Sequence, residues 1–326
     1  MTYALVARKL RKTFAAQRRQ IEAVRGIDLQ VSAGEVFALL GPNGAGKTTT
    51  VRMLTTLLPI DSGTADVAGV DVTRDPAEVR RRIGLVGQHG GADLAATGRE
   101  NLLLQGQLYG ADRAAAERRA AELIELLGLG EFVDRRAQTY SGGQRRRLEL
   151  ALGLMHNPRL LFLDEPSTGL DPQNRANLWD QLRTLRAAGT TIFLTTHYLE
   201  EADAAADRVA IVDHGRVVAE GSPAELKREL GTQSVRLKPK ADRTAVEEVA
   251  ASLRTLPFVA ESQPADGAIQ LTVEDGARVL PPLLDHLRER RIELESLTLA
   301  EPSLDDVFLA KTGRALRDTG EEGRAA

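Results

Sequence analysis

The sequence predicts an α/β domain that is followed by a small α+β domain. Over residues 1–230, short apolar runs alternate with stretches whose apolar residues recur at helical spacing, the pattern of a sheet flanked by helices. The interval of about 90–150 contains helical stretches alone, which indicates a helical insert. Residues 232–313 change to the order strand, helix, strand, strand, helix, strand. We therefore expect domains over 1–231 and 232–313, with a disordered polar tail over 314–326.

The first motif follows a predicted buried strand over 35–40. Residues 41–48 are GPNGAGKT, the phosphate-loop pattern of glycine, four residues, glycine, lysine and threonine. Its glycines let backbone N–H groups point inward, and the helix that begins at Lys47 adds the positive end of its dipole. Lys47 is expected to reach the β- and γ-phosphates of a nucleotide, and Thr48 to bind Mg²⁺. A glycine-rich turn without a ligand is the alternative. The predicted nucleotide-binding residues are Gly41, Pro42, Asn43, Gly44, Ala45, Gly46, Lys47, Thr48 and Thr49.

A second helix start of this kind lies after the helical insert. Ser141 precedes a helix that continues to about Met155, and serine is suited to be its N-cap. Gly142 and Gly143 leave the backbone N–H groups accessible at the positive end of the helix, where anions bind well. An ordinary capped helix is the alternative.

Two adjacent acids follow the next predicted strand, Leu160–Leu163. Asp164 is placed to hold Mg²⁺ through water, and Glu165 to position and polarise an attacking water. A solvated pair of acids is the alternative, but four apolar residues lead into them, which favours the end of a buried strand. The segments in this order therefore predict nucleotide hydrolysis.

Together these motifs resemble the nucleotide-binding subunit of ABC transporters over residues 1–230. In that resemblance GPNGAGKTT is the Walker A motif, Gln88 the Q-loop, YSGGQ the signature, LLFLDE the Walker B motif, residues 167–171 the D-loop and residues 195–197 the H-loop. The resemblance implies a P-loop NTPase fold that binds ATP and Mg²⁺, hydrolyses ATP and pairs with a membrane permease that is a separate chain.

The resemblance also assigns roles to single residues. Glu165 is implied as the general base, His197 as a contact to the γ-phosphate, and Gln88 as the link between Mg²⁺ and the membrane partner. The implied metal contacts are Thr48, Gln88 and Asp164. The signature residues Ser141, Gly142, Gly143 and Gln144 of one copy are implied to cover the ATP of a second copy, which gives a homodimer with ATP between its subunits. Asp171 is implied to lie at the dimer contact.

Three further segments refine the resemblance. The stretch 85–89, LVGQH, lacks the proline that adjoins this glutamine in much of the family. It resembles the exporter subgroup associated with daunorubicin and doxorubicin resistance, as do TGRENL at 97–102 and LDDVF at 304–308. Phe14 matches a position that is usually tyrosine and is expected to stack on the adenine ring. Packing of Phe14 in the edge sheet is the alternative.

The C-terminal segment predicts a ferredoxin-like module of order βαββαβ with a hairpin turn at Asp266-Gly267. A capped helix follows at 304–309. Its residues Leu304, Val307 and Phe308 share one face and are expected to dock on the permease or partner subunit. The alternative is that this face closes the core of the module itself.

Composition narrows the function classes. The 326 residues carry a net charge of −3, and the basic clusters at 80–82 and 145–147 lack interleaved aromatics, so we interpret both as solvated faces and expect no nucleic-acid partner. There are no cysteines, which excludes disulfides and thiolate metal sites. The first residues, MTYALVARK, lack the basic-then-apolar order of a secretion signal, and no apolar stretch approaches the length needed to span a bilayer, so we expect no membrane span.

We therefore expect a cytoplasmic ATPase, held at the inner face of the membrane by its permease, that exports a drug, an antibiotic or another hydrophobic compound. A soluble ABC ATPase that acts on nucleic acid or ribosomes is the alternative. Proteins of that kind usually carry tandem domains or a long coiled-coil insert, and this chain has neither. A nucleotide-binding scaffold without hydrolysis is disfavoured by the presence of Glu165 and His197.

Overall fold

The computed structural model describes residues 2–16, 19–88, 90–231, 233–240, 243–265, 267–300 and 302–313. The chain divides into two compact units, one that ends at Pro223 and one that begins at Ala224. Helix α8 (Pro223–Glu229) therefore groups with the second unit, whereas the boundary expected near Gly231 leaves it with the first. The tail expected over 314–326 lies outside the described residues. So do His89 and Asp266.

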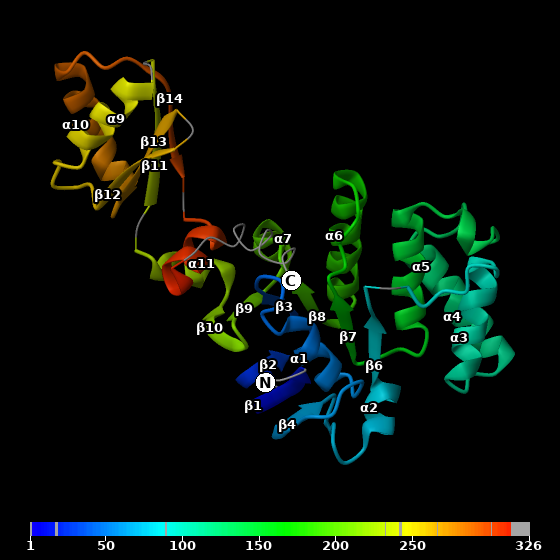
Figure 1. The fold of residues 1–326 in the computed structure, drawn as a ribbon. Coiled ribbons are helices and arrows are strands. Elements are labelled where there is room, and N and C mark those ends of the chain that lie inside the picture. Colours follow the sequence, from blue (N-terminus) through cyan, green and yellow to red (C-terminus); the bar gives the residue numbers. More distant parts are fainter. Residues whose placement is uncertain are drawn as a thin grey trace. The chain divides into compact units, whose positions relative to one another are not determined.

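A six-stranded sheet forms the centre of the first unit (Figure 1). Its order is β10 (Arg216–Gly221), β9 (Arg208–Asp213), β3 (Val36–Leu40), β8 (Thr191–Thr196), β7 (Leu160–Asp164) and β6 (Ile83–Val86). All pairs except β9–β10 are parallel. Every residue of β3, β7 and β8 is buried, as expected for parallel strands covered on both faces.

The register of these parallel strands decides where the motifs meet. Leu40, the last residue of β3, pairs with Thr196 at the end of β8, and Asp164 at the end of β7 pairs with Thr195. The carboxyl ends of the three strands thus lie at one edge of the sheet. In open α/β sheets this edge is where ligands bind.

A second, antiparallel sheet has the order β2 (Arg19–Ser32), β1 (Tyr3–Ala16), β4 (Ser62–Val67) and β5 (Val70–Asp71). Helix α1 (Lys47–Leu54) buries Val51, Met53 and Leu54 in a core cluster that also contains residues of both sheets. This packing fixes the start of α1 relative to the ends of the parallel strands.

The predicted helical insert consists of α3 (Gly98–Leu108), α4 (Arg113–Leu126) and α5 (Gly142–Leu154), which pack on one another (Figure 1). Capping boxes start α3 at Thr97 and α5 at Ser141. The other helical segments of this unit are α2 (Pro76–Arg82), the 3-10 turn η1 (Ala137–Thr139), α6 (Pro172–Ala187) and α7 (Leu199–Ala205). Among the described residues, no helix has the length and apolar character needed to cross a membrane.

The second unit confirms the predicted βαββαβ order. Its elements are β11 (Gln233–Pro239), α9 (Arg243–Leu253), β12 (Glu261–Ala265), β13 (Ala268–Val273), α10 (Gly276–Glu289) and β14 (Leu294–Ala300). The sheet order is β12-β13-β11-β14 with every pair antiparallel, which is the ferredoxin-like arrangement. Alternate residues of β11 and β13 face α9 and α10 and form the core.

Helix α11 (Leu304–Thr312) corrects one expectation. Leu304, Val307 and Phe308 do share a face, but they are only 0–2% exposed. A face that is already covered within the chain has no apolar area left to gain by docking on a permease. Docking through these three side chains is therefore wrong. The alternative, that the face closes the core of the module itself, stays a prediction, because the core cluster of the second unit does not include these side chains.

Candidate functional site

The phosphate-loop segment joins the buried strand β3 to helix α1, as the sequence predicts. Gly46 immediately precedes the helix with a φ of +104°, a conformation that favours glycine. A Cβ atom at this position would also lie 2.4 Å from the backbone oxygen of Ala23. Any larger residue at Gly46 would therefore displace either the loop or the neighbouring strand β2.

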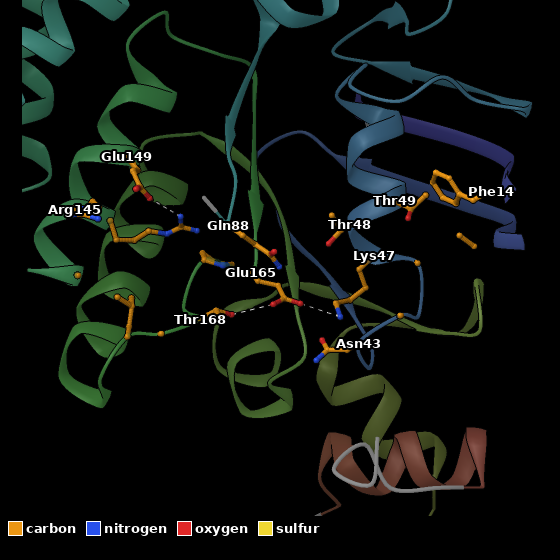
Figure 2. A pocket seen from close by; sticks show the side chains of 18 residues that line it. Phe14, Asn43, Lys47, Thr48, Thr49, Gln88, Arg145, Glu149, Glu165 and Thr168 are labelled. Atoms are coloured by element: carbon orange, nitrogen blue, oxygen red, sulfur yellow. Dashed lines mark hydrogen bonds and ion pairs between the residues drawn. The ribbon is translucent and has the colours of Figure 1, made fainter. Parts of the chain in front are cut away.

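A cavity of about 790 Å³ lies against this loop (Figure 2). The volume is within the range of small-molecule and cofactor sites. Of the predicted site residues, the cavity is lined by Phe14, Asn43, Gly44, Gly46, Lys47, Thr48, Thr49, Gln88, Gly142 and Glu165. The phosphate loop, the Q-loop glutamine, the Walker B acid and one signature glycine thus meet around one cavity.

Lys47 lies between the loop that precedes it and the acid after β7. Its Nζ donates hydrogen bonds to the backbone oxygens of Gly41 at 2.8 Å and Pro42 at 3.1 Å, and lies 3.5 Å from Glu165 Oε1. Only 4% of the residue is exposed. Burial lowers the pKa of Lys47, while the charges of Glu165 and Asp164 oppose that shift.

Glu165 is held from several sides. Its backbone N–H donates to Thr195 Oγ1 at 2.9 Å, and its Oε2 accepts a hydrogen bond from Thr168 Oγ1 at 3.3 Å (Figure 2). His197 Nδ1 lies 3.5 Å from Oε1, the oxygen that faces Lys47. The neighbouring His197, with Lys47 adding its charge, lowers the pKa of Glu165 to about 2. Glu165 is therefore a carboxylate at neutral pH.

Asp164 and Thr48 meet beside this carboxylate. Asp164 Oδ1 accepts hydrogen bonds from Thr48 Oγ1 at 3.2 Å and from Thr195 Oγ1 at 2.6 Å. Gln88 reaches the same cavity from the segment that follows β6. The oxygens of these side chains form a hard donor set of the kind that Mg²⁺ prefers.

The signature residues have different positions: Ser141 and Gln144 cap helix α5, whereas Gly142 lines the cavity. Ser141 and Gln144 cap each other's backbone N–H groups at 3.1–3.2 Å, so both side chains are engaged at the start of α5. Gly142 lines the cavity. Gly143 packs against α6, because a Cβ atom there would lie 2.0 Å from Asn174 Oδ1. Helix α5 therefore starts with a capping box, and the backbone at Gly142 remains accessible at the cavity.

Asp171 caps α6 by accepting a hydrogen bond from the backbone N–H of Asn174 at 2.9 Å. Phe14, near the end of β1, is 39% exposed and borders the cavity beside Thr49 (Figure 2). Part of its ring is therefore accessible at the border of the cavity.

Sequence reasoning missed several residues around the cavity. Arg145–Arg147 was expected as a solvated face, which is wrong for Arg146: it is 8% exposed and lines the cavity with Arg145. Arg146 Nη1 donates to the backbone oxygen of Gly87 and to Glu149 Oε2, both at 3.0 Å. The spacing of Arg146 and Glu149, three residues apart on one helix, is a signal for such a pair. The burial that makes the pair important follows only from the packing of α5.

Comparison with known proteins agrees with this site. Residues 24–168 match the family model described as ABC transporter, and residues 221–312 match the one described as ATP-binding protein DrrA1-3-like, C-terminal domain. The daunorubicin/doxorubicin resistance ATP-binding protein DrrA of Streptomyces peucetius is 48% identical over 93% of this chain and 92% of its own length. The doxorubicin resistance ATP-binding protein DrrA of Mycobacterium tuberculosis is 44% identical over 95% and 93%.

Among solved structures, a dimeric ATP-binding cassette bound to ADP and phosphate matches with a TM-score of 0.61, at 24% identity, over 67% of this chain and 98% of that chain. This match concerns the fold alone. The identity to the curated relatives extends through both units and over nearly their whole lengths. The chain therefore belongs to the ATP-binding, ATP-hydrolysing proteins of ABC transporters, in the family that includes the DrrA proteins.

Proposed function

We propose that this chain powers the export of a drug, an antibiotic or another hydrophobic compound through a membrane permease that is a separate chain. Relatives at 44–48% identity are named for daunorubicin or doxorubicin resistance. The C-terminal unit supports the same subgroup, because residues 221–312 match the family model named after such proteins. In this function the protein is cytoplasmic and is held at the inner face of the membrane by the permease.

The proposal of ATP hydrolysis rests on the position of Glu165. This residue lines the cavity, and its Oε1 lies 3.5 Å from both Lys47 Nζ and His197 Nδ1. Glu165 is a carboxylate at neutral pH, as a general base that accepts a proton from the attacking water must be. Lys47 holds the β- and γ-phosphates from the loop, and His197, which lies 3.5 Å from the same Glu165 oxygen as Lys47, contacts the γ-phosphate. The adenine ring stacks on Phe14.

Mg²⁺ fits the oxygen donors of Thr48, Asp164 and Gln88. When bound, the ion would neutralise charge on the phosphate oxygens. The chain's own contribution is to place these donors. Thr48 Oγ1 donates a hydrogen bond to Asp164 Oδ1 at 3.2 Å, which links the start of α1 to the end of β7. The Asp164 carboxylate at the end of β7 thus lies beside Thr48, where the phosphate loop passes into α1.

We also propose a homodimer in which the segment Ser141–Gln144 of one copy covers the phosphates held by the other, with Asp171 at the contact. The start of α5 supports this proposal, because the exposed Gly142 leaves backbone N–H groups accessible at the positive end of a helix. The solved cassette of the same fold is dimeric with ADP and phosphate bound.

Drug accumulation in bacterial cells tests the proposed function. The cells carry this chain together with a candidate permease, a membrane protein of about six predicted helices. We expect them to accumulate less daunorubicin, measured by its fluorescence, than cells in which this chain carries Glu165→Gln. Equal accumulation in both strains, with ATP turnover of the parent intact, would show that daunorubicin is not the exported compound.

A further inference from the structure

Glu201 on α7 is a buried carboxylate outside the site described so far. It is 4% exposed. One of its oxygens, Oε2, accepts two hydrogen bonds, from Ser167 Oγ at 2.7 Å and from Thr196 Oγ1 at 2.9 Å. Its other oxygen lies 3.4 Å from Arg175 Nε. A carboxylate is costly to bury, and these partners offset part of that cost.

The two hydroxyl donors lie next to the residues proposed for catalysis, Ser167 in the loop after β7 and Thr196 at the end of β8. Ser167 lies two residues after Glu165, and Thr196 immediately precedes His197. Thr196 Oγ1 also accepts a hydrogen bond from the backbone N–H of Tyr198 at 3.0 Å. The chain is therefore fixed on both sides of His197, and the same carboxylate holds the loop that carries Glu165.

Arg175 adds a second connection to the same histidine. Its guanidinium carbon lies 4.8 Å from the ring centre of Tyr198, and the Tyr198 ring lies 4.0 Å from that of His197. Arg175 belongs to the first turn of α6, where its backbone N–H donates to the oxygen of Asp171 at 2.9 Å. Glu201 thus accepts hydrogen bonds from the loop after β7 and from the end of β8, and it pairs with the start of α6.

We propose that Glu201 is a positioning residue for ATP hydrolysis, which holds the Glu165 loop and the His197 loop in register through Ser167 and Thr196. The inference rests on the roles proposed above for Glu165 and His197. Its physical basis is that proton transfer requires the base and the phosphate contact to stay in place, and displacements of about 1 Å cost about 10²-fold in rate. The contacts of Lys47 with the phosphate loop do not depend on Glu201.

The test compares the ATPase kinetics of Glu201→Ala and Glu201→Gln with the parent. Glu201→Ala removes both hydrogen bonds, so we expect kcat to fall about ten-fold or more while KM for ATP changes by less than about two-fold. Glu201→Gln keeps an oxygen that can accept from both hydroxyls, so we expect kcat within about three-fold of the parent. A general loss of structure would not be rescued by glutamine in this way.

Glu220→Ala is the matched control. Burial raises the pKa of Glu220 on β10, as it raises the pKa of Glu201, and Glu220 pairs with Arg208 away from the cavity residues. We expect this variant to lose thermal stability and keep the parent kcat. If Glu201→Ala fails to fold, Thr196→Val removes, at similar volume, one of the two donors to Glu201 together with the acceptor of the Tyr198 N–H. This variant is expected to lower kcat with KM unchanged.

Three results would overturn the inference: parent kcat in the folded Glu201→Ala or Thr196→Val protein, a KM that rises as much as kcat falls, or a glutamine variant as impaired as the alanine variant. These outcomes remain distinct from a failure of the proposed catalytic roles. In that case Glu165→Gln itself would hydrolyse ATP at the parent rate.

Discussion

Lys47 Nζ lies 3.5 Å from Glu165 Oε1, so the cation expected to bind phosphate is paired with the carboxylate expected to activate water. A γ-phosphate that enters the cavity competes with Glu165 for this cation. Its arrival would leave Glu165 with His197 and Thr168 as neighbours. The two residues therefore have separable effects on binding and on hydrolysis.

Glu165→Gln should preserve ATP binding, or tighten it, because the competing negative charge is gone and the loop contacts of Lys47 remain. Hydrolysis should fall by about 10²–10⁴-fold, the usual cost of losing a general base. Equilibrium binding of ATP and release of phosphate measure the two effects. Glu125→Gln, which changes an exposed acid on α4, is the control and should match the parent. Parent-like hydrolysis by Glu165→Gln would refute the assignment of the base.

Lys47→Ala should weaken ATP binding itself, because a charge-assisted contact to phosphate is lost. The expected loss of about 1.5–3 kcal/mol corresponds to roughly 10–150-fold in Kd. Isothermal titration with ATP measures it, and Lys240→Ala, a change at an exposed lysine of the second unit, is the control. An unchanged Kd would mean that Lys47 does not reach the phosphates.

The low pKa of Glu165 predicts a pH-dependent stability. A carboxyl group whose folded pKa of about 2 lies below its ordinary 4.5 stabilises the fold at pH values above the ordinary pKa, and this contribution is lost as the pH falls through the folded pKa. In nucleotide-free protein with a chelator present, the parent should therefore exceed Glu165→Gln in Tm at about pH 6, and the difference should shrink towards about pH 3. Thermal melts across this range check it. A difference that stays constant would contradict the proposed ion pair.

Mixing two inactive variants tests the proposed homodimer. Lys47→Ala damages the phosphate loop, and Ser141→Arg damages the signature. If the signature acts on the other copy, a mixed dimer has one site with both defects and one site with none. Equal mixtures should therefore regain about a quarter of the parent ATPase activity per chain after subunit exchange.

The control mixture combines Lys47→Ala with Glu165→Gln. Both changes lie on the same side of the proposed site, so each site of the mixed dimer keeps one defect and no activity should return. Differently tagged subunits report whether mixed dimers form. Mixed dimers of Lys47→Ala and Ser141→Arg without any recovery would place the signature on the phosphates of its own chain.

The unit boundary predicts how the chain tolerates truncation. A chain that ends at Pro223 should bind ATP with parent affinity but lose stable association with its permease or lose drug export. A chain that ends at Gly231 should aggregate more readily, because it retains α8 and its buried Leu226 without the rest of the second unit, including the Lys311 partner of Glu229. Size-exclusion chromatography and membrane co-purification measure these outcomes. Full export by the shorter chain would make the second unit dispensable.

The sequence by itself determined the local features of this protein. The loop at 41–48 is a contiguous motif whose glycines act on their own backbone, so the strand, loop and helix could be predicted from neighbouring residues alone. The caps at Ser141 and Ser303 depend on residues three positions apart, and both form as capping boxes. The ferredoxin-like order followed from apolar periodicity over each short element.

Only the tertiary structure decided which distant groups meet. Lys47, Glu165 and His197 come from three segments, and the register of β3, β7 and β8 brings them together at one edge of the sheet. Arg146 was expected to be solvated and Phe308 to dock on a partner, yet both are buried. Periodicity shows which residues share a face, but what covers that face depends on the packing of elements that are distant in sequence. The contacts of Glu201 with Ser167, Thr196 and Arg175 also depend on tertiary packing, because these residues lie in segments that no local motif connects.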